Sequence, residues 1–376
     1  MFNLKEYLAD LEKLVSIDSG KGCVEGQLEV ANFLKDKFDG LGWQTQLHDI
    51  GTEVGPMLSC VNRQAEAYDL MMMGHIDTVF PKGHVEINPF KIDGDLAYGS
   101  GIADMKQGAL MAYYIIKEMP KEVLDKLNIA VVFNPDEEIG SRYSAKAYKD
   151  IAQKSEYCYI YEATPLDGKR TIERKGAFGL TVEFFGKAGH CGYMFTNGAK
   201  SAVNELAYWI LEFYKLHSEQ RNTTVNSVVL EGGTASNIVP GYAKLKTSIR
   251  FALKDERDNI SKTLSRLQEH AKEQGIGVEI QIIDEHPLIP SEKGYRYAKE
   301  VEQLVKTIAP DFSYELKGGL SDGNIIGQFG PIVIDSLGPM GNAVHTDNEH
   351  IKISKIEESF NVSTIMIKNL AERKKV

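Results

Sequence analysis

The chain has 376 residues, of which 43% are hydrophobic and 26% are charged. At roughly 150 residues per domain, this length predicts two or three domains, with enough chain to bury a core without disulfides or a structural metal. Lys and Arg total 43 and Asp and Glu total 53, giving a net charge of −10, which argues against nucleic acids and anionic membranes as main partners.

The N-terminus and the cysteines predict a cytoplasmic protein. The first segment carries Glu6, Asp10 and Glu12 and lacks the basic start and apolar core of a signal peptide. No apolar run approaches the roughly 18 residues that a membrane helix needs. The four cysteines have neither a CxxC pair nor dense spacing, which is typical of reduced thiols; they are Cys23, Cys60, Cys158 and Cys191.

Strands alternate with helices in the first part of the chain. Hydrophobic periodicity predicts helices at 3–15, 26–38 and 103–117, strands at 70–74, 129–133 and 157–161, and a hairpin at 90–98 closed by Asp93 and Gly94. This alternation predicts an α/β domain with a largely parallel sheet.

The pattern changes after Gly176. Strands at 180–185, 223–230, 242–251 and 278–283 and helices at 199–215 and 255–272 follow in the order β-α-β-β-α-β. This order is that of a ferredoxin-like unit. The α/β pattern then returns with a helix at 295–308, a strand at 332–335 and a terminal helix from Ser354. We therefore expect a catalytic domain at 1–175 and 285–376, interrupted by an inserted domain at 176–284.

Two motifs whose side chains could bind a metal or take part in catalysis lie where predicted strands or helices begin or end. His75 and Asp77 follow the strand at 70–74, and side chains two apart on an extended chain point the same way, so the carboxylate can orient the imidazole toward a metal. Asp104 ends the run G-S-G-I-A-D at a helix start, where an ordinary helix cap worth about 1 kcal/mol is the alternative. A strand-end histidine beside a solvated carboxylate is the alternative for the first motif.

Acidic residues gather where the next two strands end. Three adjacent carboxylates, at 136–138, follow the strand at 129–133, and Glu162 ends the strand after it. Adjacent carboxylates repel one another, so a positive group should compensate them, and a divalent metal is the strongest candidate. A solvated acidic loop and a carboxylate at the rim are the alternatives.

A second histidine, His345, lies in a glycine-rich loop after the strand that ends at Asp335. Alone it fits an exposed loop residue. Together, however, two histidines and several carboxylates fall just beyond strands, along one expected edge of one sheet. Mixed imidazole and carboxylate ligands suit two zinc ions that share a bridging carboxylate.

In this order the motifs resemble the di-zinc metallopeptidases, a family that includes glutamate carboxypeptidase, acetylornithine deacetylase, succinyl-diaminopimelate desuccinylase and cytosolic dipeptidases. The resemblance runs from about Leu14 to the C-terminus and is carried by H-x-D at 75–77, G-x-G-x-x-D-M-K at 99–106, D-E-E at 136–138, Glu162 and H-T at 345–346. The insert resembles the family at 189–192 (GHCG), 232–240 (GGTASNIVP) and 248–250 (SIR), and the segment 318–324 (GGLSDGN) resembles the loop that lines the family's pocket. Cys191 departs from it, because a small residue is usual there. The segment G-I-A-D-M-K at 101–106 and these loops are most similar to the glutamate carboxypeptidase branch of the family.

The resemblance implies a ligand set for two zinc ions, although cobalt or manganese could occupy such ligands. Asp104 would bridge the two ions. One ion would be completed by His75 and Glu162, and the other by Glu138 and His345. The resemblance also implies a cis peptide bond after Asp104.

The remaining candidate residues would act on the substrate or on the ligands. Asp77 would orient His75, and Glu137 would be the general base. His190 would stabilise the oxyanion, and the residues that would hold the substrate are Asn237, Arg250 and Gly319. Each residue of the insert also has a purely structural alternative. His190 could be an exposed loop residue, Asn237 a turn residue, and Arg250 a partner in a local salt bridge.

The function predicted is release of a C-terminal amino acid, with glutamate as the candidate, from a peptide or N-acyl amino acid. Within the enzyme class the alternatives are an N-acyl amino acid deacylase and a dipeptidase. A catalytically silent metal-binding relative is the alternative outside it, and Glu137 argues against silence. A magnesium phosphoryl-transfer enzyme is disfavoured because two histidine ligands suit zinc better.

We also expect a homodimer formed through the inserted lid domain. A ferredoxin-like unit has an exposed sheet edge, which invites pairing with a second chain about a twofold axis. The helix at 199–215 carries more apolar surface than a small sheet needs, at Leu206, Trp209, Ile210 and Phe213. The resemblance adds that His190 would reach the active site of the partner. The alternative is a monomer whose helix packs on its own sheet.

Overall fold

The computed structural model describes residues 2–374, which form two compact units. The first comprises the chain up to Glu173, Ile289–Leu316 and the chain from Ser321 onward, and the second comprises Arg174–Leu288 with Lys317–Leu320. The outermost residues of the expected catalytic domain, 1, 375 and 376, lie outside the described chain. None of the described helices combines the length and apolar character needed to cross a membrane.

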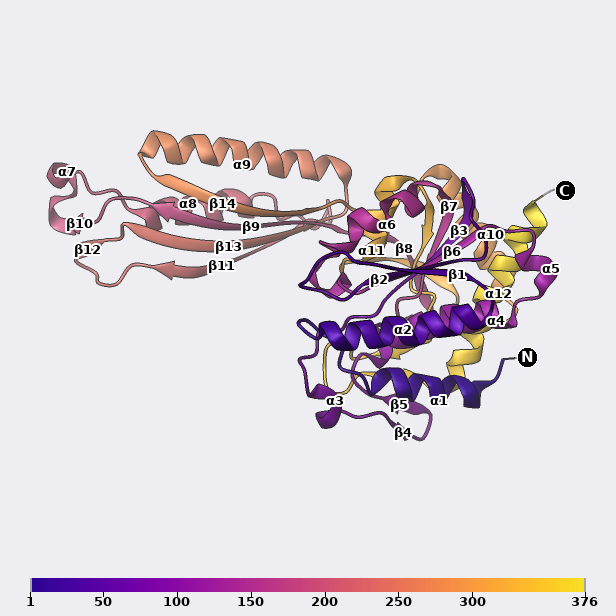
Figure 1. The fold of residues 1–376 in the computed structure, drawn as a ribbon. Coiled ribbons are helices and arrows are strands. Elements are labelled where there is room, and N and C mark those ends of the chain that lie inside the picture. Colours follow the sequence, from indigo (N-terminus) through magenta and orange to yellow (C-terminus); the bar gives the residue numbers. More distant parts are fainter. Residues whose placement is uncertain (1, 375–376) are drawn as a thin grey trace. The chain divides into compact units, whose positions relative to one another are not determined.

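A six-stranded sheet in the order β1-β2-β6-β3-β7-β16 forms the centre of the first unit (Figure 1). Its strands are β1 (Gln44–His48), β2 (Met57–Val61), β3 (Tyr68–His75), β6 (Ile129–Asn134), β7 (Ser155–Ile160) and β16 (Ile332–Ile334). The last four strands run parallel to one another, whereas β1 and β2 pair antiparallel at one edge. The fold is therefore mixed α/β with a mostly parallel sheet, as the sequence predicts.

Helices cover the sheet, which explains why β3 and β6 are buried at every position. The helices are α1 (Leu4–Val15), α2 (Val24–Gly40), α3 (His84–Ile87), α4 (Gln107–Glu118), α5 (Lys121–Leu124), α6 (Ser144–Gln153), α10 (Glu292–Val305), α11 (Asp322–Ile326) and α12 (Ile356–Arg373). Short helical turns are η1 (Ile102–Lys106), η2 (Glu137–Ile139), η4 (Gly327–Phe329) and η5 (Ile353–Lys355). Side chains of α1, α2, α4 and α12 join the sheet in one large core.

Two small sheets complete this part of the chain. One pairs β8 (Lys169–Arg174) with β15 (Ser313–Lys317). The other has the order β17-β18-β5-β4, formed by Gly341–Asn342, His350–Lys352, Leu96–Tyr98 and Lys91–Asp93. The second sheet joins the expected hairpin to the segment that follows His345.

Three details differ from the sequence predictions. The edge strand β1 and its neighbour β2 were not predicted. The hairpin pairs Asp93 with Leu96, so its turn is Gly94-Asp95 rather than Asp93-Gly94, because Gly94 takes the left-handed conformation at φ 58°. Regular helix begins at Gln107 rather than at 103, because the backbone at Asp104 and Met105 is non-helical.

The second unit is a four-stranded antiparallel sheet in the order β11-β13-β9-β14 with two helices packed on it (Figure 1). Its elements are β9 (Gly176–Phe185), β10 (Gly189–His190), η3 (Cys191–Tyr193), α7 (Met194–Asn197), α8 (Ala202–Tyr214), β11 (Thr224–Gly232), β12 (Ile238–Val239), β13 (Tyr242–Phe251), α9 (Lys254–Gln274) and β14 (Gly277–Glu285). The first strand lies between the third and fourth, which is a ferredoxin-like arrangement.

Helix α8 buries its main apolar stripe inside this unit. Leu206, Trp209 and Phe213 are at most 2% exposed. They belong to the core that this unit's sheet and α9 also form. Ile210 is partly buried against the same core. The expectation that these side chains form surplus surface for a partner is therefore wrong, because the sheet and α9 already cover them.

Close packing of α4 on β7 generates a stability prediction. A Cβ added at Gly108 would lie 1.8 Å from the carbonyl oxygen of Tyr161, whereas one at Gly40, the last residue of α2, meets nothing within 4 Å. We expect Gly108→Ala to lower the free energy of unfolding by about 1–3 kcal/mol or more, as overpacking does. Gly40→Ala should be neutral or stabilising by up to about 1 kcal/mol.

Urea unfolding followed by Trp43 fluorescence checks this prediction. The chain has two tryptophans, so a Trp209→Phe background leaves Trp43, which is 8% exposed in the first unit, as the reporter. Equal midpoints for the two glycine variants would contradict the packing argument.

Candidate metal centre

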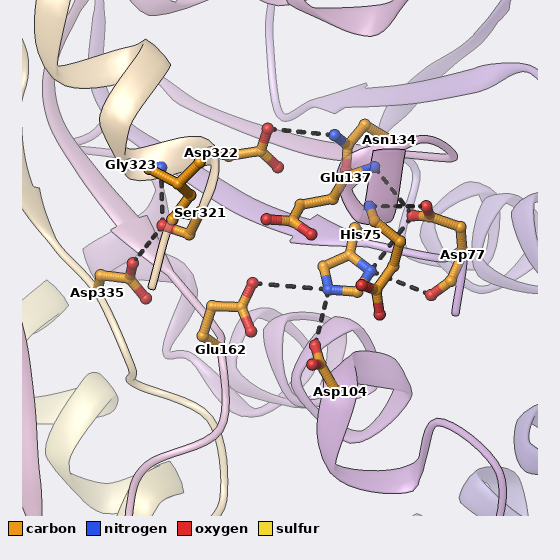
Figure 2. Close-up of polar contacts among 12 residues, drawn as sticks. His75, Asp77, Asp104, Asn134, Glu137, Glu162, Ser321, Asp322, Gly323 and Asp335 are labelled. Atoms are coloured by element: carbon orange, nitrogen blue, oxygen red, sulfur yellow. Dashed lines mark hydrogen bonds and ion pairs between the residues drawn. The ribbon is translucent and has the colours of Figure 1, made fainter. Parts of the chain in front are cut away.

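His75 ends β3 and is fully buried. Its Nδ1 lies 3.1 Å from the backbone oxygen of Asp77 and 3.3 Å from a carboxylate oxygen of the same residue. Its Nε2 lies 3.0 Å from Asp104 Oδ1 and 3.6 Å from Glu162 Oε1 (Figure 2). The ring is thus fixed from one side by Asp77 and presents its other nitrogen to two carboxylates.

Asp104 lies in the η1 turn, where the peptide bond to Met105 is cis, as the resemblance implies. Its two carboxylate oxygens face different imidazoles. Oδ1 lies 3.0 Å from His75 Nε2, and Oδ2 lies 3.1 Å from His345 Nε2. The non-helical turn therefore aims one carboxylate at two separate groups of potential ligands.

Glu137 and Glu138 follow β6 in the short η2 turn. Asp77 holds this turn, because its two carboxylate oxygens accept hydrogen bonds from the backbone N–H groups of Glu137 at 3.2 Å and Glu138 at 3.0 Å. Glu138 Oε2 lies 3.4 Å from His345 Nε2, whereas its buried Oε1 has no hydrogen-bond partner within the described chain. Asp77 thereby connects the ends of two neighbouring strands.

Two ligand sets result, each with its donor atoms within 4.8 Å of one another. The first is His75, Asp104 and Glu162, the second is Asp104, Glu138 and His345, and Asp104 belongs to both. Imidazole nitrogens mixed with carboxylate oxygens form a donor set suited to zinc. The partnerless Glu138 oxygen is a further acceptor that a cation would satisfy, so these residues fit two divalent ions.

The carboxylates around both histidines favour the protonated form of each ring. Burial alone would lower the pKa of His75, but its hydrogen bonds to Asp104 and Asp77 outweigh burial and raise that pKa well above its usual value. Hydrogen bonds to Asp104 and Glu138 raise the pKa of His345 to about 10. Because a metal binds the unprotonated imidazole, metal binding near neutral pH must release protons.

Glu137 has a different environment from the ligands. Burial raises its pKa well above the usual value, and the nearby carboxylates of Glu162, Asp322 and Glu138 raise it further, while His75 acts in the opposite direction. Figure 2 shows its carboxylate directed into the space bordered by His75, Glu162 and Asp322. A carboxyl group with a raised pKa is suited to exchanging protons near neutral pH.

A buried polar network lies behind Glu137 and was not predicted. Asp322 Oδ1 accepts a hydrogen bond from Asn134 Nδ2 at 3.3 Å (Figure 2). It also accepts hydrogen bonds from Ser141 Oγ at 2.5 Å and Tyr148 OH at 3.1 Å. Burial raises the pKa of Asp322 to about 7. The resemblance marked this loop only as pocket lining. In the sequence, Asp322 appears only as an aspartate shortly after a pair of glycines. That pattern is also typical of an exposed turn, so it did not identify Asp322 as a buried acceptor.

The predicted oxyanion residue His190 and the three predicted substrate residues belong to the second unit. His190 is exposed and its Nδ1 accepts the N–H of Gly192 at 3.1 Å. Asn237 and Gly319 are also exposed. Arg250 is half-buried on β13, burial lowers its pKa, and its Nη1 has no hydrogen-bond partner within the described residues.

Comparison with known proteins now identifies the family. The sequence profile of peptidase family M20/M25/M40 matches residues 71–369. The chain belongs to this family. Carboxypeptidase G2 of Pseudomonas sp. (strain RS-16) is 30% identical over 370 residues, which cover 97% of this chain and 89% of the relative. As a member of this family, the chain is a metallopeptidase-type hydrolase acting on amide bonds.

Other relatives differ in the reaction that their names describe. Succinyl-diaminopimelate desuccinylase of Rickettsia rickettsii (strain Sheila Smith) is 25% identical over 383 residues, covering 95% of this chain and 97% of the relative. Among solved structures, a dinuclear metal-binding M20 peptidase of Bacillus subtilis superposes with a TM-score of 0.71 at 12% identity, covering 98% of each chain. That likeness concerns the fold.

The geometry predicts the response to metal. Adding zinc to metal-free protein should raise its melting temperature, since a ligand at 100 times its Kd stabilises the folded state by about 2.7 kcal/mol. Calorimetry in buffers of different ionisation enthalpy should detect proton release.

His345→Ala should lower the zinc stoichiometry from two to one. His350→Ala is the control and should keep both ions, because the ring nitrogen of His350 bonds the Asn348 backbone and His350 belongs to neither ligand set. Absence of any thermal shift with zinc, cobalt and manganese would contradict the assignment.

Proposed function

We propose that this chain is a two-zinc carboxypeptidase that releases a C-terminal amino acid, with glutamate as the candidate, from a short peptide or an N-acyl amino acid. The observation that carries the proposal is the division of the Asp104 carboxylate between His75 and His345. The relative named carboxypeptidase G2 supports the choice of reaction, because it matches nearly the whole chain.

Five side chains would hold the metals: His75 and Glu162 one ion, Glu138 and His345 the other, and Asp104 both. When bound, the two ions would polarise the substrate carbonyl and increase the acidity of the attacking water. Cobalt or manganese could occupy the same ligands. Asp77 would keep the His75 ring in the orientation and tautomer that leave Nε2 available.

Glu137 would move the proton. Its carboxylate would accept the proton of the attacking water and then deliver it to the leaving nitrogen. Two features support this role: Asp77 fixes the backbone of the turn, and the burial that raises the Glu137 pKa favours proton uptake. Glu137 lies beside both ligand sets without belonging to either of them.

Substrate recognition would come from the second unit. Arg250 would bind the free carboxylate of the amino acid to be released, since a guanidinium forms paired hydrogen bonds with a carboxylate and one Arg250 nitrogen is without a partner in the described chain. Asn237 would assist it, Gly319 would line the pocket, and His190 would stabilise the oxyanion.

A substrate panel tests the proposed reaction. We expect zinc-dependent release of glutamate from N-acyl glutamates and short peptides, and little release when the terminal carboxylate is amidated, because Arg250 would lose its partner. Glu137→Gln should lower turnover by about 10²–10⁴-fold with unchanged zinc content. Preferred release of acetate or succinate from other amino acids would favour a deacylase, cleavage of dipeptides alone a dipeptidase, and no turnover a silent relative.

We propose that the enzyme is a cytoplasmic homodimer joined through the second unit. Strand β11 is an edge of its sheet and exposes Val228, Val229 and Leu230, each about half exposed. Leu211 and Tyr214 on α8 are also exposed. Pairing of two such edges would cover this apolar surface. All four cysteines are free, which is consistent with a reducing compartment.

Subunit complementation tests the shared site that the family resemblance implies. His190→Ala and Glu137→Gln proteins should each be nearly inactive. If His190 serves the partner's metal centre, mixing them under subunit exchange should restore activity, because some sites then combine an intact base with an intact histidine. Light scattering should give the mass of a dimer. No recovery in a mixture shown to exchange subunits would refute the shared site.

A further inference from the structure

Glu349 is a fully buried carboxylate in the segment between His345 and β18. Its Oε1 accepts hydrogen bonds from the backbone N–H groups of Ala103 at 2.7 Å and Asp104 at 2.8 Å. Its Oε2 accepts a third from the N–H of Gly101 at 3.1 Å. One side chain therefore satisfies three backbone donors of the turn that carries Asp104, from a position about 245 residues later in the sequence.

This turn needs an acceptor from elsewhere. The first N–H groups of a helix have no partner within the helix, and a side chain at the cap position usually satisfies one of them. Here Gly101 occupies the cap position and provides no side-chain hydrogen bond. The carboxylate of Asp104 faces the two imidazoles, so it is not used to cap its own turn.

The same residue restrains the segment that carries His345. Ala343 and His345 both have left-handed backbone angles, with φ of 55° and 64°, which is uncommon for residues other than glycine. The N–H of Glu349 donates to the backbone oxygen of Thr346 at 3.1 Å, and Thr346 Oγ1 donates to the oxygen of Ala343 at 2.7 Å. This chain of bonds links the fixed side chain of Glu349 to the turn around His345.

A second tie holds the segment nearby. His84 is 8% exposed, its Nε2 lies 3.0 Å from Asp347 Oδ1, and its Nδ1 lies 2.7 Å from Ser100 Oγ. Ser100 precedes the Asp104 turn, so both contacts join the same two segments of chain. Asp347 is largely exposed, however, whereas Glu349 is buried and bonds to Asp104 itself. Glu349 is therefore the stronger of the two restraints.

We propose that Glu349 is a positioning residue that sets the geometry of the bridging carboxylate and couples it to His345. It contacts Asp104 through that residue's backbone N–H and none of the atoms that would bind metal. The inference rests on the proposed two-metal site and deepens it. Its consequence is specific: loss of Glu349 should weaken both metal positions together, because Asp104 belongs to both, whereas loss of His345 should weaken one.

Metal affinity tests the proposal without substrate. Zinc occupancy of Glu349→Ala, measured against a competing chelator, should show an affinity lower by about 10- to 100-fold at both positions, the loss typical of residues that orient ligands. The visible spectrum of the cobalt-loaded variant should also change. Glu349→Gln should lose less, because its carbonyl oxygen can still accept from Ala103 and Asp104 while its amide group faces the N–H of Gly101. Excess zinc should restore part of the lost activity.

Asp10→Asn is the matched control. Asp10 is also a buried carboxylate with several partners, including Lys37 and Tyr114, but it lies on α1 and bonds no residue of the ligand sets. It should lose stability without losing zinc affinity. Wild-type affinity and an unchanged cobalt spectrum in Glu349→Ala, or in Glu349→Gln if the alanine variant does not fold, would overturn the proposal. Failure of the wild-type protein to bind metal would instead refute the proposed function.

Discussion

The site depends on one carboxylate that faces two imidazoles. Asp104 presents separate oxygens to His75 and His345, and each histidine also approaches a second carboxylate. In the metal-free protein the carboxylates favour protonated imidazoles, because their hydrogen bonds raise the pKa values of both rings. With deprotonated rings, the same residues form a group of acceptors that suits cations. Metal and proton therefore compete for one set of atoms.

Parallel strands explain how the ligands converge. β3, β6 and β7 are neighbours in the sheet, and their carboxyl ends deliver His75, the turn with Glu137 and Glu138, and Glu162 to one edge. Asp77 crosses between two of these ends by accepting both N–H groups of the glutamate pair. The sheet supplies proximity, and hydrogen bonds between the strand ends supply orientation.

Residues at strand ends could be predicted from sequence, because apolar runs mark the strands and parallel pairing brings their ends together. His75, Glu138 and Glu162 are of this kind. The roles of Glu349 and Asp322 could not be predicted, since each bonds to residues more than 170 positions away in the sequence. The family resemblance supplied the cis bond after Asp104, which no periodicity indicates. Strands β1 and β2 were missed because each is only five residues long, which is too short to show a clear periodicity.

The division of residues between the two units has a chemical consequence. All five proposed ligands and the proposed base lie in the first unit, where hydrogen bonds among them and to Glu349 are internal. The proposed substrate residues lie in the second unit on exposed loops or, for Arg250, on a strand with an unsatisfied nitrogen. Under the proposed function, changes to those loops would change which substrate is accepted without disturbing the metal ligands. That separation would suit a family in which relatives named carboxypeptidase and desuccinylase match one sequence over nearly its whole length.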